Sequence, residues 1–161
     1  MTNIGKDYIF IKKETIYMTL TDIFKKLKQK ENFTFGEPQN DQQIRDLENE
    51  LKVVFPESYK EFLSKYGYAS WFGGSIYGVS KNPYYDLLRK NKLMREEKVP
   101  LDFNPLPKDA FLIKDYGDAY FLLYGMNSTR AGQVGMFLSE SGYQEEQSWG
   151  SFEEFLEDYY C

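Results

Sequence analysis

The chain of 161 residues contains no histidine, and its single cysteine, Cys161, is the last residue. Without histidine there is no imidazole to act as a general base, to activate a serine or cysteine nucleophile, or to bind a metal. One cysteine excludes an intramolecular disulfide and a multi-cysteine metal site. We therefore expect no cofactor and no metal, and this cysteine usage is typical of a cytoplasmic protein.

Long apolar runs are also lacking. Charged residues between Lys6 and Glu14 interrupt the apolar residues near the start, which is not the pattern of a signal peptide. No apolar run approaches the length of a membrane-spanning helix. The sequence therefore predicts no membrane partner.

Basic residues are absent from 131–161, although the rest of the chain has 20 of them. The remaining 130 residues have a slight positive balance, so the net charge of −5 comes entirely from the C-terminal segment. This balance argues against nucleic acid as a partner, because phosphate contacts dominate such binding. It favours a basic protein partner. The acidic residues of the segment are Glu140, Glu145, Glu146, Glu153, Glu154, Glu157 and Asp158.

Residues 44–78 contain the most informative pattern. Apolar residues at helical spacing up to Leu51 predict a helix, with Asn40 and Asp41 as possible N-caps. Pro56 suits the first turn of a second helix, where its missing N–H costs nothing. The apolar stripe of that helix is Tyr59, Phe62, Leu63 and Tyr66, and Gly67 is expected to end it.

Weaker signals surround these two helices. Gly73-Gly74 predicts a turn before a strand over 75–80. Upstream, a helix is expected over 21–30 with Thr21 as its cap. Downstream, Asn82-Pro83 predicts a cap and first turn for a helix to about Glu97, and three prolines make 99–108 a loop.

The C-terminal part has the pattern of an antiparallel meander followed by a helix. Ser151 with Glu154 predicts a capping box for that closing helix. The order of elements predicts an α+β fold, in which N-terminal helices pack on a mostly antiparallel sheet. We expect one domain over 19–161, with 1–18 as a peripheral segment. The expected strands cover 110–114, 119–124, 133–138 and about 143–147.

This order of signals resembles the SUKH superfamily, and within it the SMI1/KNR4-like bacterial immunity proteins related to yeast cell-wall assembly regulators. The match covers roughly residues 19–160. It rests on the helix before Leu51, on Phe55-Pro56 opening the next helix, on Tyr66-Gly67, and on Gly73-Gly74 followed by Ile76-Tyr77-Gly78.

The resemblance implies a binding protein without catalytic activity. Its function would be that of an immunity protein, which neutralises a cognate polymorphic toxin, of the nuclease type, by occluding the toxin's active site. The alternative is a scaffold or regulatory interaction protein, as the eukaryotic relatives resemble. The N-terminal 18 residues and the loop over 99–108 have no counterpart in this resemblance.

Candidate contact residues follow from charge and expected exposure, and not from a family motif. Complementary charge mainly speeds association and adds specificity, which favours carboxylates on the last strand and helix. Large aromatic side chains are frequent energetic anchors of interfaces, although core packing is their commoner role. The predicted contacts are Glu145, Glu146, Glu153 and Glu157, with Trp71 and Trp149 as aromatic anchors.

A carboxylate-based hydrolase is the third hypothesis. Two carboxyl groups can perform acid–base chemistry when their environments separate their pKa values. Asp115 and Asp118 flank a glycine, and Glu145-Glu146 follow later in the chain. Turn chemistry explains the first pair and solvent exposure the second. We therefore expect that the protein is not an enzyme.

Overall fold

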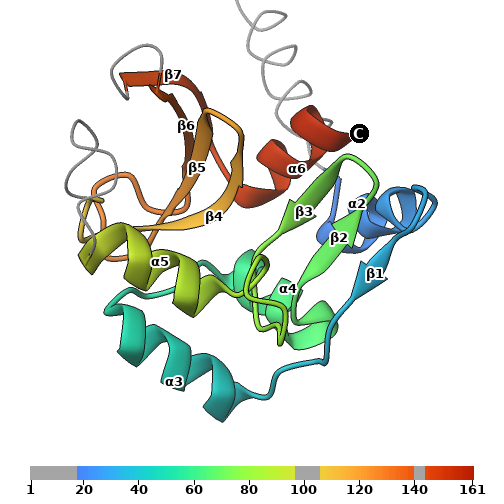
Figure 1. Ribbon diagram of the computed structural model, residues 1–161, viewed down its shortest axis with the longest axis horizontal. Coiled ribbons are helices and arrows are strands. Elements are labelled where there is room, and N and C mark those ends of the chain that lie inside the picture. Colours follow the sequence, from blue (N-terminus) through green and yellow to red (C-terminus); the bar gives the residue numbers. More distant parts are fainter. Residues whose placement is uncertain (1–17, 97–105, 140–143) are drawn as a thin grey trace, which may run out of the picture.

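The computed structural model describes residues 18–96, 106–139 and 144–161, which form helices and two antiparallel sheets (Figure 1). The α+β prediction is confirmed. The helices are α2 (Leu20–Leu27), α3 (Asp41–Leu51), α4 (Glu57–Tyr66), α5 (Leu87–Glu96) and α6 (Phe152–Tyr160). The smaller sheet contains β1 (Thr34–Phe35), β2 (Ala69–Trp71) and β3 (Gly74–Ile76). The larger sheet contains β4 (Ala110–Tyr116), β5 (Ala119–Tyr124), β6 (Val134–Leu138) and β7 (Gln144–Trp149).

The larger sheet is a meander in which each strand pairs with the next one along the chain. Tyr116 pairs with Ala119 at the β4–β5 turn, and Ala119 pairs in turn with Leu138 of β6. Figure 1 shows α6 beside this sheet, and α6 contacts β7, α2 and α4. The closing helix therefore joins the larger sheet to the N-terminal helices. Within the described ranges, no helix is long and apolar enough to cross a membrane.

The two helices predicted from 44–78 are confirmed. The Asn40 side chain accepts a hydrogen bond from the Gln43 N–H, and the Gln43 side chain accepts one from the Asn40 N–H, which completes a capping box. Pro56 stands at the N-cap of α4, one position before the first turn. Gly67 ends α4 with a φ of 71°, a conformation that favours glycine.

Two helix boundaries were predicted wrongly. Thr19, and not Thr21, caps α2 by accepting a hydrogen bond from the Asp22 N–H, and the helix ends at Leu27. Residues 82–85 form a turn in place of the first turn of α5. The Asp86 carboxylate accepts the Arg89 N–H at 3.1 Å, so α5 begins at Leu87.

The strand predictions succeed for the larger sheet and fail in part for the smaller one. No strand was predicted for β1 or β2, which are two and three residues long. The strand expected over 75–80 is limited to Gly74–Ile76. The peripheral segment 1–18 lies outside the described residues apart from Met18, as does most of the loop over 99–108.

Tyr59 stands at the centre of an aromatic core. Its ring lies 5.2 Å from that of Phe111 on β4 and 5.4 Å from that of Phe152 on α6. The buried hydroxyl donates a hydrogen bond of 2.7 Å to the Tyr77 carbonyl. The side chain therefore ties α4 to the sheet and to the closing helix, which positions the C-terminal segment.

Candidate partner-binding surface

The acidic C-terminal segment folds into β7, a tight turn and α6. The Ser151 hydroxyl accepts the Glu154 N–H at 3.1 Å, as predicted for the start of α6. The Glu154 carboxylate accepts the N–H of Gly150 at 2.6 Å and not that of the N-cap Ser151, so only the Ser151 half of the predicted capping box is formed. This contact holds Glu154 at the positive N-terminal end of the helix.

An open hollow of about 550 Å³ lies between α2 and the outer side of α6. Lys26 supplies its one basic side chain, against three carboxylates. We call this surface the acidic hollow. It is lined by Lys26, Trp149, Glu154, Glu157, Asp158 and Cys161.

Trp149 forms part of the floor of the acidic hollow. Its indole Nε1 donates a hydrogen bond of 2.8 Å to Asp158. The ring packs against Phe155 at 5.0 Å, and only 7% of the residue is exposed. A partner would therefore contact little of this ring. In the structure, Trp149 holds the Asp158 carboxylate in place.

Glu153 and Glu157 lie one helical turn apart on α6 and are both half-buried. The Glu157 carboxylate accepts the backbone N–H of Met18 at 3.5 Å, while one oxygen of Glu153 is buried. Within the described part of the chain, that Glu153 oxygen has no hydrogen-bond partner. A buried carboxylate oxygen in this state favours a donor from elsewhere.

Glu145 on β7 is neutralised by an ion pair. Its carboxylate lies 2.6 Å from Nη2 of Arg130, with both side chains about one-third exposed. Arg130 also donates hydrogen bonds of 3.0 Å to the Tyr124 hydroxyl and to Gln133. The bond to Glu145 raises the pKa of Arg130, which therefore keeps its charge. Glu145 thus presents less free negative charge than the sequence suggests.

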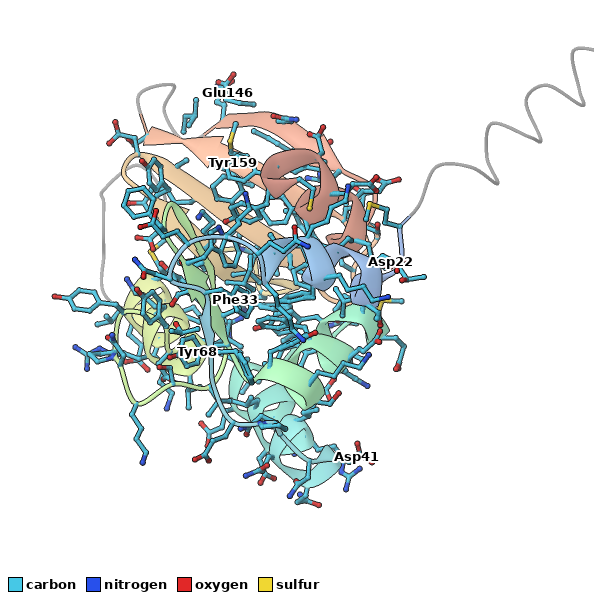
Figure 2. All side chains as sticks on the ribbon, turned by 90° about the vertical axis from the view of Figure 1, so that its right-hand side faces the viewer. Asp22, Phe33, Asp41, Tyr68, Glu146 and Tyr159 are labelled. Atoms are coloured by element: carbon cyan, nitrogen blue, oxygen red, sulfur yellow. The ribbon has the colours of Figure 1, made fainter. Side chains whose placement is uncertain are left out.

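Glu146 is exposed and stands at a β-bulge. Met136 pairs with Gln147 and Phe137 pairs with Glu145, so Glu146 is the extra residue of β7. Figure 2 shows its side chain pointing away from the body of the molecule. Of the predicted carboxylates, this one is the most accessible to a partner.

Trp71 is buried in the smaller sheet, far along the chain from the acidic segment. Its ring stacks on Phe33 at 6.1 Å and meets the ring of Tyr160 edge-on at 4.7 Å. The residue is 7% exposed, whereas its neighbour Phe72 is 75% exposed. Core packing explains Trp71, and its role as a partner anchor stays a prediction.

The carboxylates of the hydrolase hypothesis have separate surroundings. Asp115 lies 3.7 Å from Lys90, and burial raises the pKa of this carboxyl. Asp118 occupies the β4–β5 turn, where its carbonyl accepts the Ser139 N–H. Among the described residues, no three histidine, cysteine or acidic side chains are placed to hold a metal ion.

The structure brings some predicted residues together and leaves others apart. Glu157 and Trp149 meet at the acidic hollow, together with Glu154 and Asp158, which were not singled out from the sequence. Helical spacing from the buried Phe155 could have indicated Asp158. Glu145 is paired elsewhere, with Arg130.

Comparisons with known proteins agree with the fold. The family profile described as SUKH_5, SMI1-KNR4 cell-wall, matches residues 20–161. A crystal structure of a protein from Pseudomonas syringae pv. tomato is similar, with a TM-score of 0.63 and 19% identity. The similarity covers 86% of this chain and 96% of that one. No curated protein matches the chain.

Proposed function

Because the chain belongs to the SUKH family with the description SMI1-KNR4 cell-wall, we propose that it acts by binding another protein and not by catalysis. The observation that carries the proposal is the one-sided charge of the C-terminal segment. It has seven acidic residues and no basic one, and three of the acidic residues line one hollow.

The partner in this proposal is a cognate toxin domain with a basic active-site channel. A nuclease-type toxin fits this chemistry, because a channel that binds phosphates must be positively charged. The acidic surface would cover the channel and exclude its substrate. Complementary charge would raise the association rate, which suits an inhibitor that must act quickly.

The proposed contact residues are expected to contribute unequally to partner binding. Glu146 and Glu157 contribute most, because one is exposed and the other lines the acidic hollow. Glu153 contributes through its unpaired oxygen, and Glu145 contributes less because Arg130 neutralises it. Trp149 supports the surface from beneath.

A scaffold role is the second candidate. The family description names the cell wall, and this observation supports a regulatory interaction partner. The two candidates share the protein-binding surface and differ in the partner. A growth assay separates them, because only an immunity protein rescues cells from a toxin.

The test is co-expression with the C-terminal domain of the neighbouring large open reading frame. We expect rescue of growth and co-purification by the wild-type chain and weaker rescue by Glu146→Gln/Glu157→Gln. The matched control is Glu37→Gln/Glu57→Gln, which removes the same charge from exposed positions outside the segment. Toxicity without rescue or complex would contradict the immunity proposal and favour the scaffold.

A further inference from the structure

Lys114 on β4 is a buried lysine that has no anionic partner among the described residues. Only 2% of the residue is exposed. Among the described residues, no carboxylate forms an ion pair with its ammonium group, and no acceptor forms a hydrogen bond with it. Buried charges in proteins are normally paired, so this lysine requires an explanation.

Tyrosine rings surround the ammonium group. Lys114 Nζ lies 4.9 Å from the ring centroid of Tyr160, 5.6 Å from that of Tyr116 and 5.9 Å from that of Tyr159. Such cation–π contacts stabilise a lysine, but aromatic rings accept no full hydrogen bond from its N–H groups. The hydrogen-bonding capacity of the ammonium group therefore stays largely unused.

Three acidic groups of β4 and α6 have partners other than Lys114. Asp115, the next residue on β4, lies 3.7 Å from Lys90. On α6, Asp158 accepts the Trp149 indole and Glu157 accepts the Met18 N–H. No acidic side chain of the flanking elements β4 and α6 is thus paired with Lys114.

Two tyrosine hydroxyls are available beside Lys114. The Tyr160 hydroxyl donates to the Ser75 carbonyl at 3.2 Å and is occupied. Tyr116 and Tyr159 are 65% and 39% exposed, and their hydroxyls have no hydrogen-bond partner among the described residues. Burial raises the pKa of Tyr159, and the charge of Tyr116 raises it further. The two rings flank the same ammonium group, since both centroids lie within 5.9 Å of Lys114 Nζ.

We propose that Lys114 and the hydroxyls of Tyr116 and Tyr159 form a binding site for a carboxylate. The ammonium group would supply the charge, and the two phenols would each donate a hydrogen bond to a carboxylate oxygen. Charge-assisted hydrogen bonds of this kind are the stronger ones in proteins. The exposed edges of Tyr116 and Tyr159 open the site to solvent at the β4–β5 turn.

The electrostatics of the free site agree with this assignment. Burial lowers the pKa of Lys114 to about 8, and no anion of the described residues offsets the loss of solvent. A bound carboxylate would favour the charged ammonium and raise this pKa. The site is distinct from the acidic hollow and does not require the proposed toxin. Its carboxylate could be a free organic acid or an aspartate presented by a protein chain, and these two sources are tested separately.

The experiment follows the Lys114 side chain by NMR as pH is raised, using chain labelled with ¹³C at lysine Cε. The probes are sodium acetate for a free acid and a blocked Ala-Asp-Ala peptide for a protein-borne carboxylate. Sodium chloride at equal ionic strength is the reference. Lys90, which already has a carboxylate partner, is the internal control.

We expect acetate, the peptide or both to raise the pKa of Lys114 by about one unit, a roughly tenfold preference of the carboxylate for the charged lysine. The pKa of Lys90 should not change. Tyr116→Phe should weaken the effect, whereas Tyr84→Phe, at another exposed tyrosine, should leave it intact. A shift with the peptide alone assigns the site to a protein partner. An equal shift in sodium chloride, or no shift with either probe, would overturn the proposal.

Discussion

The carboxylate of Glu145 lies 2.6 Å from Nη2 of Arg130, in an ion pair that joins β7 to the turn before β6. Glu146, the next residue, is exposed at a bulge. The two glutamates are adjacent in sequence, yet only one of them offers an unpaired charge to a partner. This difference gives a matched pair of variants.

We expect Glu146→Gln to slow association with the proposed toxin domain more than Glu145→Gln does. Loss of an accessible charge reduces long-range attraction, whereas Arg130 already screens Glu145. Association rates measured by surface plasmon resonance at low and high salt check this. Equal effects of the two variants on the association rate would show that the ion pair with Arg130 does not reduce the contribution of Glu145.

Gly78 should tolerate no side chain. A Cβ atom there would overlap the carbonyl oxygen of Gly67, and that carbonyl accepts the Val79 N–H. We expect Gly78→Ala to destabilise the fold by about 3 kcal/mol or more, because the clash involves backbone that cannot move freely.

Gly117→Ala is the control for this prediction. Gly117 also needs its conformation, with a φ of 56°, but nothing lies within 4 Å of its missing Cβ. Gly117→Ala should therefore lower the free energy of unfolding by only about 1–2 kcal/mol, because an alanine in the left-handed region is strained. Urea unfolding measures the stability of both variants. An equal loss of stability at the two positions would contradict the proposed clash at Gly78.

Stability should depend on pH through Lys114. The pKa of its ammonium is about 8 in the folded chain and near 10.5 when unfolded, so the unfolded chain binds more protons between these values. The cost of burying the charge is fully present below pH 8 and is relieved as pH rises towards 10.5. Its upper limit is about 3 kcal/mol.

Lys114→Met should therefore be more stable than the wild type at pH 7, and the gap should narrow by pH 9.5. Urea unfolding at both pH values measures this gap. The tyrosines are common to both chains, so their titration cancels in the comparison. A gap that does not change with pH would mean that Lys114 stays charged up to pH 9.5 in the folded chain, so that burial does not lower its pKa.

Tyr59→Phe tests the centre of the core. The substitution keeps the ring and removes the hydroxyl that donates to the Tyr77 carbonyl. We expect a loss of about 1–3 kcal/mol, since a buried carbonyl loses its donor. Tyr85→Phe is the control, because it also removes a tyrosine hydroxyl while the half-buried ring keeps its stacking on Tyr68. Thermal unfolding of both variants should separate them clearly.

Prediction from sequence succeeded where local signals and tertiary structure agree. The Asn40 cap, the apolar stripes of α3 and α4, and the stop at Gly67 are all local features, and all are confirmed. The larger sheet was predictable because its strands are long and joined by glycine-containing turns.

The misses have tertiary causes. β1 and β2 are short strands that exist through pairing with distant residues, such as Thr34 with Ser70. The ion pair of Glu145 depends on Arg130, which reaches β7 only after the chain has folded back. The isolation of Lys114 could not be predicted either, because Lys114 follows a continuous apolar run in β4 and the sequence does not show which charges lack partners.

The most direct test of the central claim is the salt dependence of association between this protein and the proposed partner, the C-terminal domain of the neighbouring large open reading frame. Our account predicts rapid binding that slows steeply with salt, and a weaker salt dependence for Glu146→Gln/Glu157→Gln than for the control Glu37→Gln/Glu57→Gln. Binding with the same salt dependence in all three chains would contradict the acidic-surface mechanism. Absence of binding would contradict the proposed partnership itself.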